Sequence, residues 1–66
     1  MTKEQAEQTL DAWGYRLLGR DPYRDYKWHV ARWIDNRTAS VSVGWAETLE
    51  DAITVAESDI YEGGNS

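Results

Sequence analysis

Residues 26–46 decide the fold, and they read YKWHVARWIDNRTASVSVGWA. On both sides of the polar stretch Asp35-Asn36-Arg37, apolar residues alternate with the others, which is the period expected of β-strands. Asn tolerates the left-handed backbone that tight hairpin turns require. We therefore predict an antiparallel hairpin with strands over residues 26–35 and 39–45.

The register of this hairpin depends on the length of its turn. A two-residue loop of Asn36 and Arg37 fixes one set of cross-strand partners: Ile34 with Ala39, Arg32 with Val41, Val30 with Val43, and Trp28 with Trp45. A loop of Asp35 and Asn36 shifts the pairing but keeps the same residues on each face. In both cases the polar face carries Lys27, His29, Ala31, Trp33, Ser40, Ser42 and Gly44.

A helix is predicted directly after the hairpin. Thr48 can cap it, and Asp51 completes the capping signature three residues later. One face carries an apolar stripe at helical spacing, formed by Leu49, Ala52, Ile53, Ala56 and Ile60. Gly63 ends the helix, and residues 63–66 are expected to form a flexible tail.

Another helix is predicted before the hairpin, with Thr2 as its cap and Gln5 completing a capping box. Its apolar face is formed by Ala6, Leu10, Trp13 and Leu17. Gly14 either ends this helix, which would allow residues 15–18 to be extended, or lies inside a helix that stops at Gly19. Pro22 excludes a helix in the next segment, so residues 19–25 are predicted to be a loop.

Together these elements predict an α+β fold of order α-β-β-α, a two-stranded antiparallel hairpin packed by helices, with residues 1–62 as a single domain. The chain has 66 residues and no cysteine. A chain this short buries only about 60% of its unfolded surface, and disulfides cannot add stability. Two strands leave two open edges, so dimerisation would complete the sheet. The pattern does not decide whether one or both sheet faces are covered.

Charge is distributed unevenly along the chain, whose net charge is −5. All seven basic residues precede residue 38, and every charged residue after it is acidic. Such asymmetry is typical of a charged docking surface or of a solvated acidic helix.

The sequence offers no catalytic set and no metal site. His29 is the only histidine, whereas zinc requires three or four Cys, His or carboxylate ligands. Ser40 and Ser42 lie within a strand and have no base in sequence range. The acids at the start of the second predicted helix stabilise its dipole. We therefore expect no enzymatic activity and no cofactor.

The N-terminal residues are polar, and no apolar run approaches the roughly 20 residues of a membrane span. We therefore expect no signal peptide, no membrane segment and a cytoplasmic location.

Two surfaces are candidates for binding a protein. One is the polar face of the hairpin, because Trp33 lies there and Trp is favoured in binding hot spots. In the alternative, the Trp33 side chain folds under the first helix or under the loop and is not available to a partner. The other is the acidic second helix. The residues that we expect to bind a partner are Lys27, His29, Trp33, Glu50, Glu57 and Asp59.

The alternative function is binding of single-stranded nucleic acid. Basic and aromatic residues interleave between residues 15 and 33, and this combination can contact phosphates and stack on bases. The residues concerned are Arg16, Arg20, Tyr23 and Arg24. The net charge of −5 opposes phosphate binding, so we expect a protein partner rather than nucleic acid.

From Tyr26 onward, the residues KWHVA, a turn and ASVSVGWAETLEDAI resemble small phage and prophage proteins in which two strands lead into a Gly-x-Ala-x-Thr-x-Glu-x-Ala helix. The stretch is also similar to the N-terminal domain of HicB-type antitoxins, from which this chain departs by its leading helix and by one strand fewer. The phage likeness implies a small intracellular protein that binds a host protein, with no catalytic residues to carry over.

Overall fold

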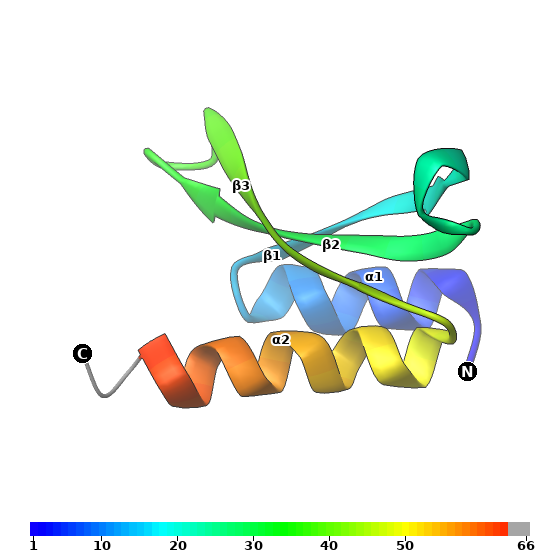
Figure 1. The fold of residues 1–66 in the computed structure, drawn as a ribbon. Helices are drawn as coiled ribbons and strands as arrows, with labels where there is room; N and C mark the ends of the chain where they lie inside the picture. The colour runs from blue at the N-terminus through cyan, green and yellow to red at the C-terminus, as the bar shows by residue number, and fades with distance from the viewer. Residues whose placement is uncertain (64–66) are drawn as a thin grey trace.

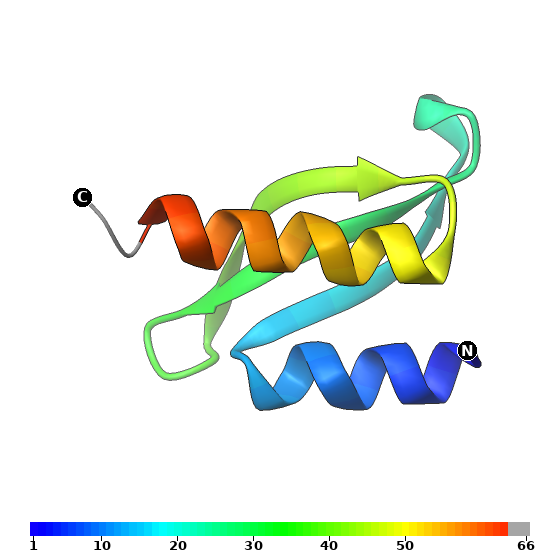
Figure 2. The ribbon, with the colours of Figure 1, turned by 90° about the horizontal axis from the view of Figure 1, so that it is seen from below.

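The computed structural model describes residues 1–63. Its elements are α1 (Lys3–Ala12), β1 (Tyr15–Asp21), the short 3-10 helix η1 (Pro22–Arg24), β2 (Lys27–Ile34), β3 (Ala39–Ala46) and α2 (Leu49–Gly63). The strands form one antiparallel sheet in the order β1-β2-β3. Both helices lie on the same face of this sheet, side by side and running in the same direction (Figures 1 and 2).

The α+β class is therefore confirmed, and the uncertainty about the layers is resolved. The molecule has two layers, one of helices and one of strands, and the second sheet face is covered by neither described helix (Figure 1). Of the predicted tail, Gly63 is the last residue of α2 and residues 64–66 lie outside the described residues.

The first helix is the shorter of the two alternatives. Thr2 and Gln5 form the predicted capping box, and Trp13 caps the other end. Gly14 follows with a φ of 84°, a conformation that glycine adopts without a steric penalty. A helix continuing to Gly19 is therefore wrong, because the chain reverses at Gly14 and continues as a strand.

That strand, β1, corrects the predicted sheet from two strands to three. Tyr15 pairs with Arg32 and Leu17 with Val30, although Leu17 also fits the helical spacing of the preceding apolar stripe. The register shifts between Leu17 and Gly19, which leaves one extra residue in a bulge. The predicted loop over residues 19–25 is thus replaced by the end of β1 and by η1.

The hairpin between β2 and β3 has the predicted register next to its turn, but the loop has four residues, 35–38, instead of two. Asp35, Asn36 and Arg37 all have positive φ, and the Thr38 amide donates to the Asp35 carbonyl at 3.2 Å. Ile34 pairs with Ala39 and Arg32 with Val41, as predicted for a turn centred on Asn36 and Arg37. The alternative loop of Asp35 and Asn36 is wrong.

Farther from the turn, the predicted register fails because of a second bulge. Val30 pairs with Gly44 instead of Val43, and Trp28 with Ala46 instead of Trp45. Because the side-chain period of a strand is two, one extra residue reverses the faces beyond it. Gly44, predicted on the polar face, therefore faces α2, where an added Cβ would lie 3.2 Å from Val55 Cγ1.

The core lies between the helices and the sheet and is built largely from small residues. Its buried members are Leu10, Tyr15, Val30, Ala46, Ala52 and Ala56. Leu10 and Val30 are the largest of the fully buried side chains, while the alanines of α2 allow close packing against the strands. Ile60 ends the predicted apolar stripe but is 45% exposed.

Candidate functional site

The sheet face opposite the helices carries a layer of aromatic and arginine side chains. It is formed by alternate residues of the three strands and by two turn residues, and we call it the open face. Its members are Arg16, Arg24, His29, Trp33, Arg37, Ser42 and Trp45. The strands position five of these side chains, and the turns at either end of the sheet supply Arg24 and Arg37.

The first half of the open face is centred on Trp33 in β2. The guanidinium carbon of Arg16 lies 4.9 Å from the centre of the Trp33 ring, and that of Arg37 lies 6.0 Å from it. Both distances are within the range of cation–π attraction. Arg37 also binds the carboxylate of Asp11 and donates to the Asp11 carbonyl at 2.8 Å, which ties the hairpin turn to the end of α1.

The second half is centred on Trp45 in β3. The His29 ring stacks on it with 4.6 Å between ring centres and 5° between planes, and the Arg24 guanidinium carbon lies 4.6 Å from its centre. The indole N–H of Trp45 donates to Asp21 at 3.1 Å. The same Asp21 carboxylate accepts from the Tyr23 amide at 2.9 Å, which orders η1 beside the sheet.

Charge on the two layers of the molecule differs in sign. Arg37 is paired with Asp11, but within residues 1–63 neither Arg16 nor Arg24 has an acidic partner. The helices carry eight of the twelve acids, in the layer on the other side of the sheet: Glu4, Glu7, Asp11, Glu50, Asp51, Glu57, Asp59 and Glu62. Asp21, which accepts a hydrogen bond from Trp45, lies on the open face with the arginines. The open face is therefore the basic side of an acidic protein.

The residues predicted to bind a protein do not form one surface. Trp33 and His29 lie on the open face, and Lys27 lies at the end of β2 beside Arg20 and Glu47. The three acids of α2 lie in the helix layer, on the other side of the sheet (Figure 1).

Two of those three acids make contacts within the chain. Glu50 lies 3.4 Å from the N-terminal amine, and a backbone hydrogen bond and this amine lower its pKa below the ordinary value. Asp59 accepts a hydrogen bond from the Tyr15 hydroxyl and lies 3.6 Å from Arg32. Glu57 is exposed. Asp59 thus supports the fold and is not free to receive a partner.

The four residues of the nucleic-acid alternative are also divided. Arg16 and Arg24 lie on the open face. Arg20 lies over Trp28, 5.0 Å from its ring centre, and Trp28 packs against the core on the helix side. Tyr23 is 93% exposed in η1. Trp45 and Arg37 also lie on the open face, although neither is among the predicted site residues. The bulge in β3 brings Trp45 to this face, and the fold of the hairpin turn brings Arg37 to it.

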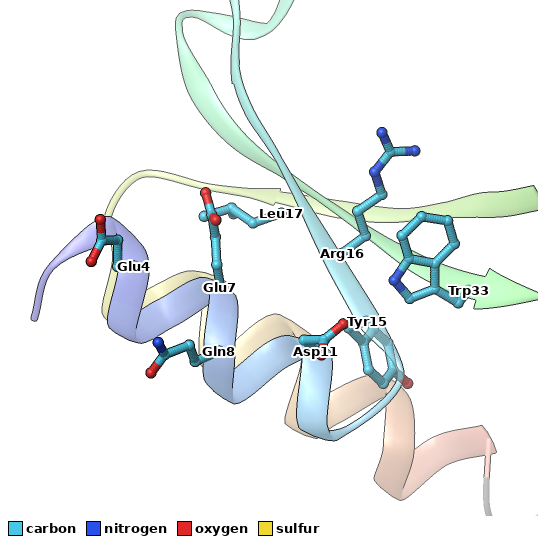
Figure 3. A pocket seen from close by; sticks show the side chains of 8 residues that line it. All are labelled: Glu4, Glu7, Gln8, Asp11, Tyr15, Arg16, Leu17 and Trp33. Carbon is cyan, nitrogen blue, oxygen red and sulfur yellow. The ribbon is translucent and has the colours of Figure 1, made fainter. Parts of the chain in front are cut away.

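A hollow of about 440 Å³ adjoins the open face at the β1 edge (Figure 3). Glu4, Glu7 and Asp11 of α1 line one wall, and Arg16 and Trp33 line the other. The hollow extends the open face around the edge of the sheet and joins its basic side to the acidic face of α1.

The sheet also brings His29 next to Ser42, which the sequence analysis had left without a base. The His29 Nε2 and the Ser42 Oγ lie 2.7 Å apart across β2 and β3. A catalytic pair needs a third group that orients the histidine, and within residues 1–63 His29 makes no other hydrogen bond. The contact is a cross-strand hydrogen bond that fixes the His29 ring on Trp45.

No known family model, curated protein or solved structure matches this chain. The likeness to small phage proteins and to HicB-type antitoxins therefore stays a prediction. Along residues 1–63, no three His, Asp or Glu side chains gather in a way that could hold a metal ion. None of the described helices has the length and apolar character needed to cross a membrane.

Tyr15 provides a test of the contact between the sheet and α2. Burial, together with the hydrogen bond to Asp59, raises the pKa of Tyr15 from 10.0 to about 12. Because the pKa is higher in the folded state, this stabilisation is complete below pH 10 and is lost as the pH rises towards about 12. We expect Tyr15→Phe to lose less stability than the wild type over this range in urea unfolding.

The matched control is Tyr23→Phe, because Tyr23 is 93% exposed. This variant should lose as much stability at alkaline pH as the wild type does. Equal alkaline losses in all three proteins would contradict the assigned role of Tyr15.

Proposed function

We propose that this protein is a small protein-binding module whose open face holds an acidic segment of a partner. One observation carries the proposal: the guanidinium groups of Arg16 and Arg24 each lie over a tryptophan ring and have no acidic partner within residues 1–63.

An arginine stacked on an aromatic ring keeps the N–H groups at the edge of its guanidinium available. These groups form a planar fork that matches a carboxylate with two parallel hydrogen bonds. The ring also holds the side chain in place, so less entropy is lost on binding. Trp and Arg are the residue types most enriched among interface hot spots. The open face combines them in two places, around Trp33 and around Trp45.

The same contacts favour a protein over nucleic acid. A base would need an open ring face for stacking, but Trp45 already contacts His29 and Arg24, and Trp33 contacts Arg16 and Arg37. The net charge of −5 also repels a phosphate chain at long range. Carboxylates bind at the guanidinium edges and require neither ring to be uncovered.

The setting of the module belongs to the same proposal. A chain without cysteine suits a reducing compartment, and we place the protein in the cytoplasm. Its partner would then be a host protein, as the phage likeness implies. The acidic face of α2 is not part of the proposed site, because Glu50 and Asp59 are already engaged within the chain.

Removing the two unpaired charges tests the proposal. In the double variant Arg16→Gln/Arg24→Gln, we expect capture of the partner to fall at least about tenfold, since each arginine would lose a charge-assisted hydrogen bond. The measurement is a pull-down with the tagged protein from nuclease-treated bacterial lysate, with the captured protein quantified by mass spectrometry.

The control is Lys3→Gln/Arg20→Gln, which makes the same change in net charge away from the open face. It should capture as much partner as the wild type. An equal loss of partner capture in both double variants would show that binding depends on net charge alone and not on the open face. In a parallel pull-down without nuclease, recovery of nucleic acid, or of proteins that nuclease treatment removes, would favour the alternative function.

A further inference from the structure

The two edges of the sheet differ in how they are protected. The β1 edge carries Arg16, Arg20 and Asp21, has a bulge near Leu18 and lies beside α1. Charges and bulges are the usual devices that prevent a further strand from pairing with an edge. The β3 edge has no charged residue over its whole length, Ala39–Ala46, and its bulge lies after Ser42. Residues 39–43 are therefore an unprotected edge.

The direction of the backbone groups on this edge follows from one hydrogen bond. The Trp33 amide donates to the Gly14 carbonyl, so the backbone groups of Trp33 point towards β1. Neighbouring residues of a strand point in opposite directions, which directs Arg32 and Ile34 towards β3. Their partners Val41 and Ala39 are thus paired within the sheet. Ser40 and Ser42 direct their amides and carbonyls outward.

We propose that a second copy of this chain pairs with residues 39–43, strand against strand and antiparallel, about a twofold axis at Val41. In this register Ser40 faces Ser42 of the second copy and Ser42 faces its Ser40. Both pairs are of the hydrogen-bonded kind, and together they make four backbone hydrogen bonds. Val41 faces the same residue of the second copy in the closely spaced, non-hydrogen-bonded position.

The sequence of the edge favours a second copy over another partner. The order Ala-Ser-Val-Ser-Val is nearly the same in both directions, so antiparallel pairing places like residues opposite each other. The Val41 side chains then meet each other as apolar groups, the serines meet as small polar groups, and no like charges lie opposite each other. Val41 is 38% exposed in the single chain and would become covered. The small core, with Leu10 and Val30 as its largest fully buried side chains, would gain from this burial.

The consequence is a continuous six-stranded sheet. A twofold axis perpendicular to the sheet keeps the helices of both copies on one side and both open faces on the other. A partner with two acidic segments would then be held at two places, with the gain in effective concentration that bivalency provides. The dimer itself does not depend on the proposed function and can be tested without any partner.

The test is self-association of the purified chain, measured by sedimentation equilibrium from micromolar to millimolar concentration. We expect association to strengthen with salt, because two chains of net charge −5 repel each other and salt screens this repulsion. Val41→Lys should weaken the dimer at least about tenfold, since it places two cations opposite each other. Leu18→Lys on the β1 edge is the matched control, because Leu18 is 40% exposed, and it should leave the dimer unchanged.

Hydrogen exchange tests the register. The Ser40 and Ser42 amides should exchange more slowly at concentrations at which the dimer forms, and at the monomer rate in Val41→Lys. A chain that stays monomeric at millimolar concentration in high salt would overturn the proposal. Association that weakens with salt would overturn it as well, by indicating that the basic open face binds the acidic helices of another copy.

Discussion

Replacing Leu10 with alanine is expected to lower the free energy of unfolding by about 2–5 kcal/mol. Leu10 is fully buried between the helices and the sheet, and three of the five other buried residues of its core cluster are alanines, which cannot fill a cavity. A domain of this size has a total stability of about 3–10 kcal/mol. The variant should therefore be partly unfolded at 25 °C, which urea unfolding followed by circular dichroism will show.

Leu18→Ala is the control for this substitution. The Leu18 side chain is 40% exposed, so its truncation should change the stability by no more than about 1 kcal/mol. If Leu10→Ala were as stable as Leu18→Ala, the helices would not pack on the sheet through Leu10.

The second helix could be predicted from sequence because its signals are local. Thr48 accepts the Asp51 amide at 3.1 Å, as the capping pattern requires. Ala52 and Ala56 lie four residues apart and are both fully buried. Cap, stripe and terminal glycine all lie within the helix or next to it, so no tertiary contact is needed to identify the element.

The strand β1 could not be identified in the same way. Leu17 continues the helical spacing that starts at Ala6, and it also fits a strand that begins at Tyr15. Only the conformation of Gly14 separates the two possibilities, and a glycine in the sequence is compatible with both. The segment forms a strand because it pairs with β2. This pairing joins residues that are distant in the sequence, so local signals do not predict it.

The open face could be predicted only in part, because its composition also depends on features that the local sequence does not mark. Trp33 and His29 could be placed on the polar face because they lie on the same side of β2, where period two holds throughout. The predicted face of Trp45 is wrong, because the bulge in β3 adds a residue that no local signal in the sequence marks. Arg37 joins the site only through the fold of the turn, where it contacts both Trp33 and Asp11.

Replacing Trp33 with alanine should have the largest effect on partner binding. The ring lies beneath Arg16 and Arg37, so its loss removes contact area and leaves the Arg16 guanidinium, which the proposed carboxylate requires in place, without its support. Arg37 stays bound to Asp11. Truncation of a hot-spot residue typically costs about 2 kcal/mol or more, which corresponds to about a 30-fold loss of affinity. The measurement is calorimetric titration of the captured partner.

The controls separate binding from stability. Trp13 is 39% exposed at the end of α1, in the helix layer, so Trp13→Ala should bind as the wild type does. Trp33→Phe keeps an aromatic ring under the arginines and should recover part of the affinity that Trp33→Ala loses. Wild-type affinity in Trp33→Ala, with its fold intact, would remove Trp33 from the proposed site. Recovery in the phenylalanine variant would show that the stacked ring, which holds Arg16 in position, is what the partner requires.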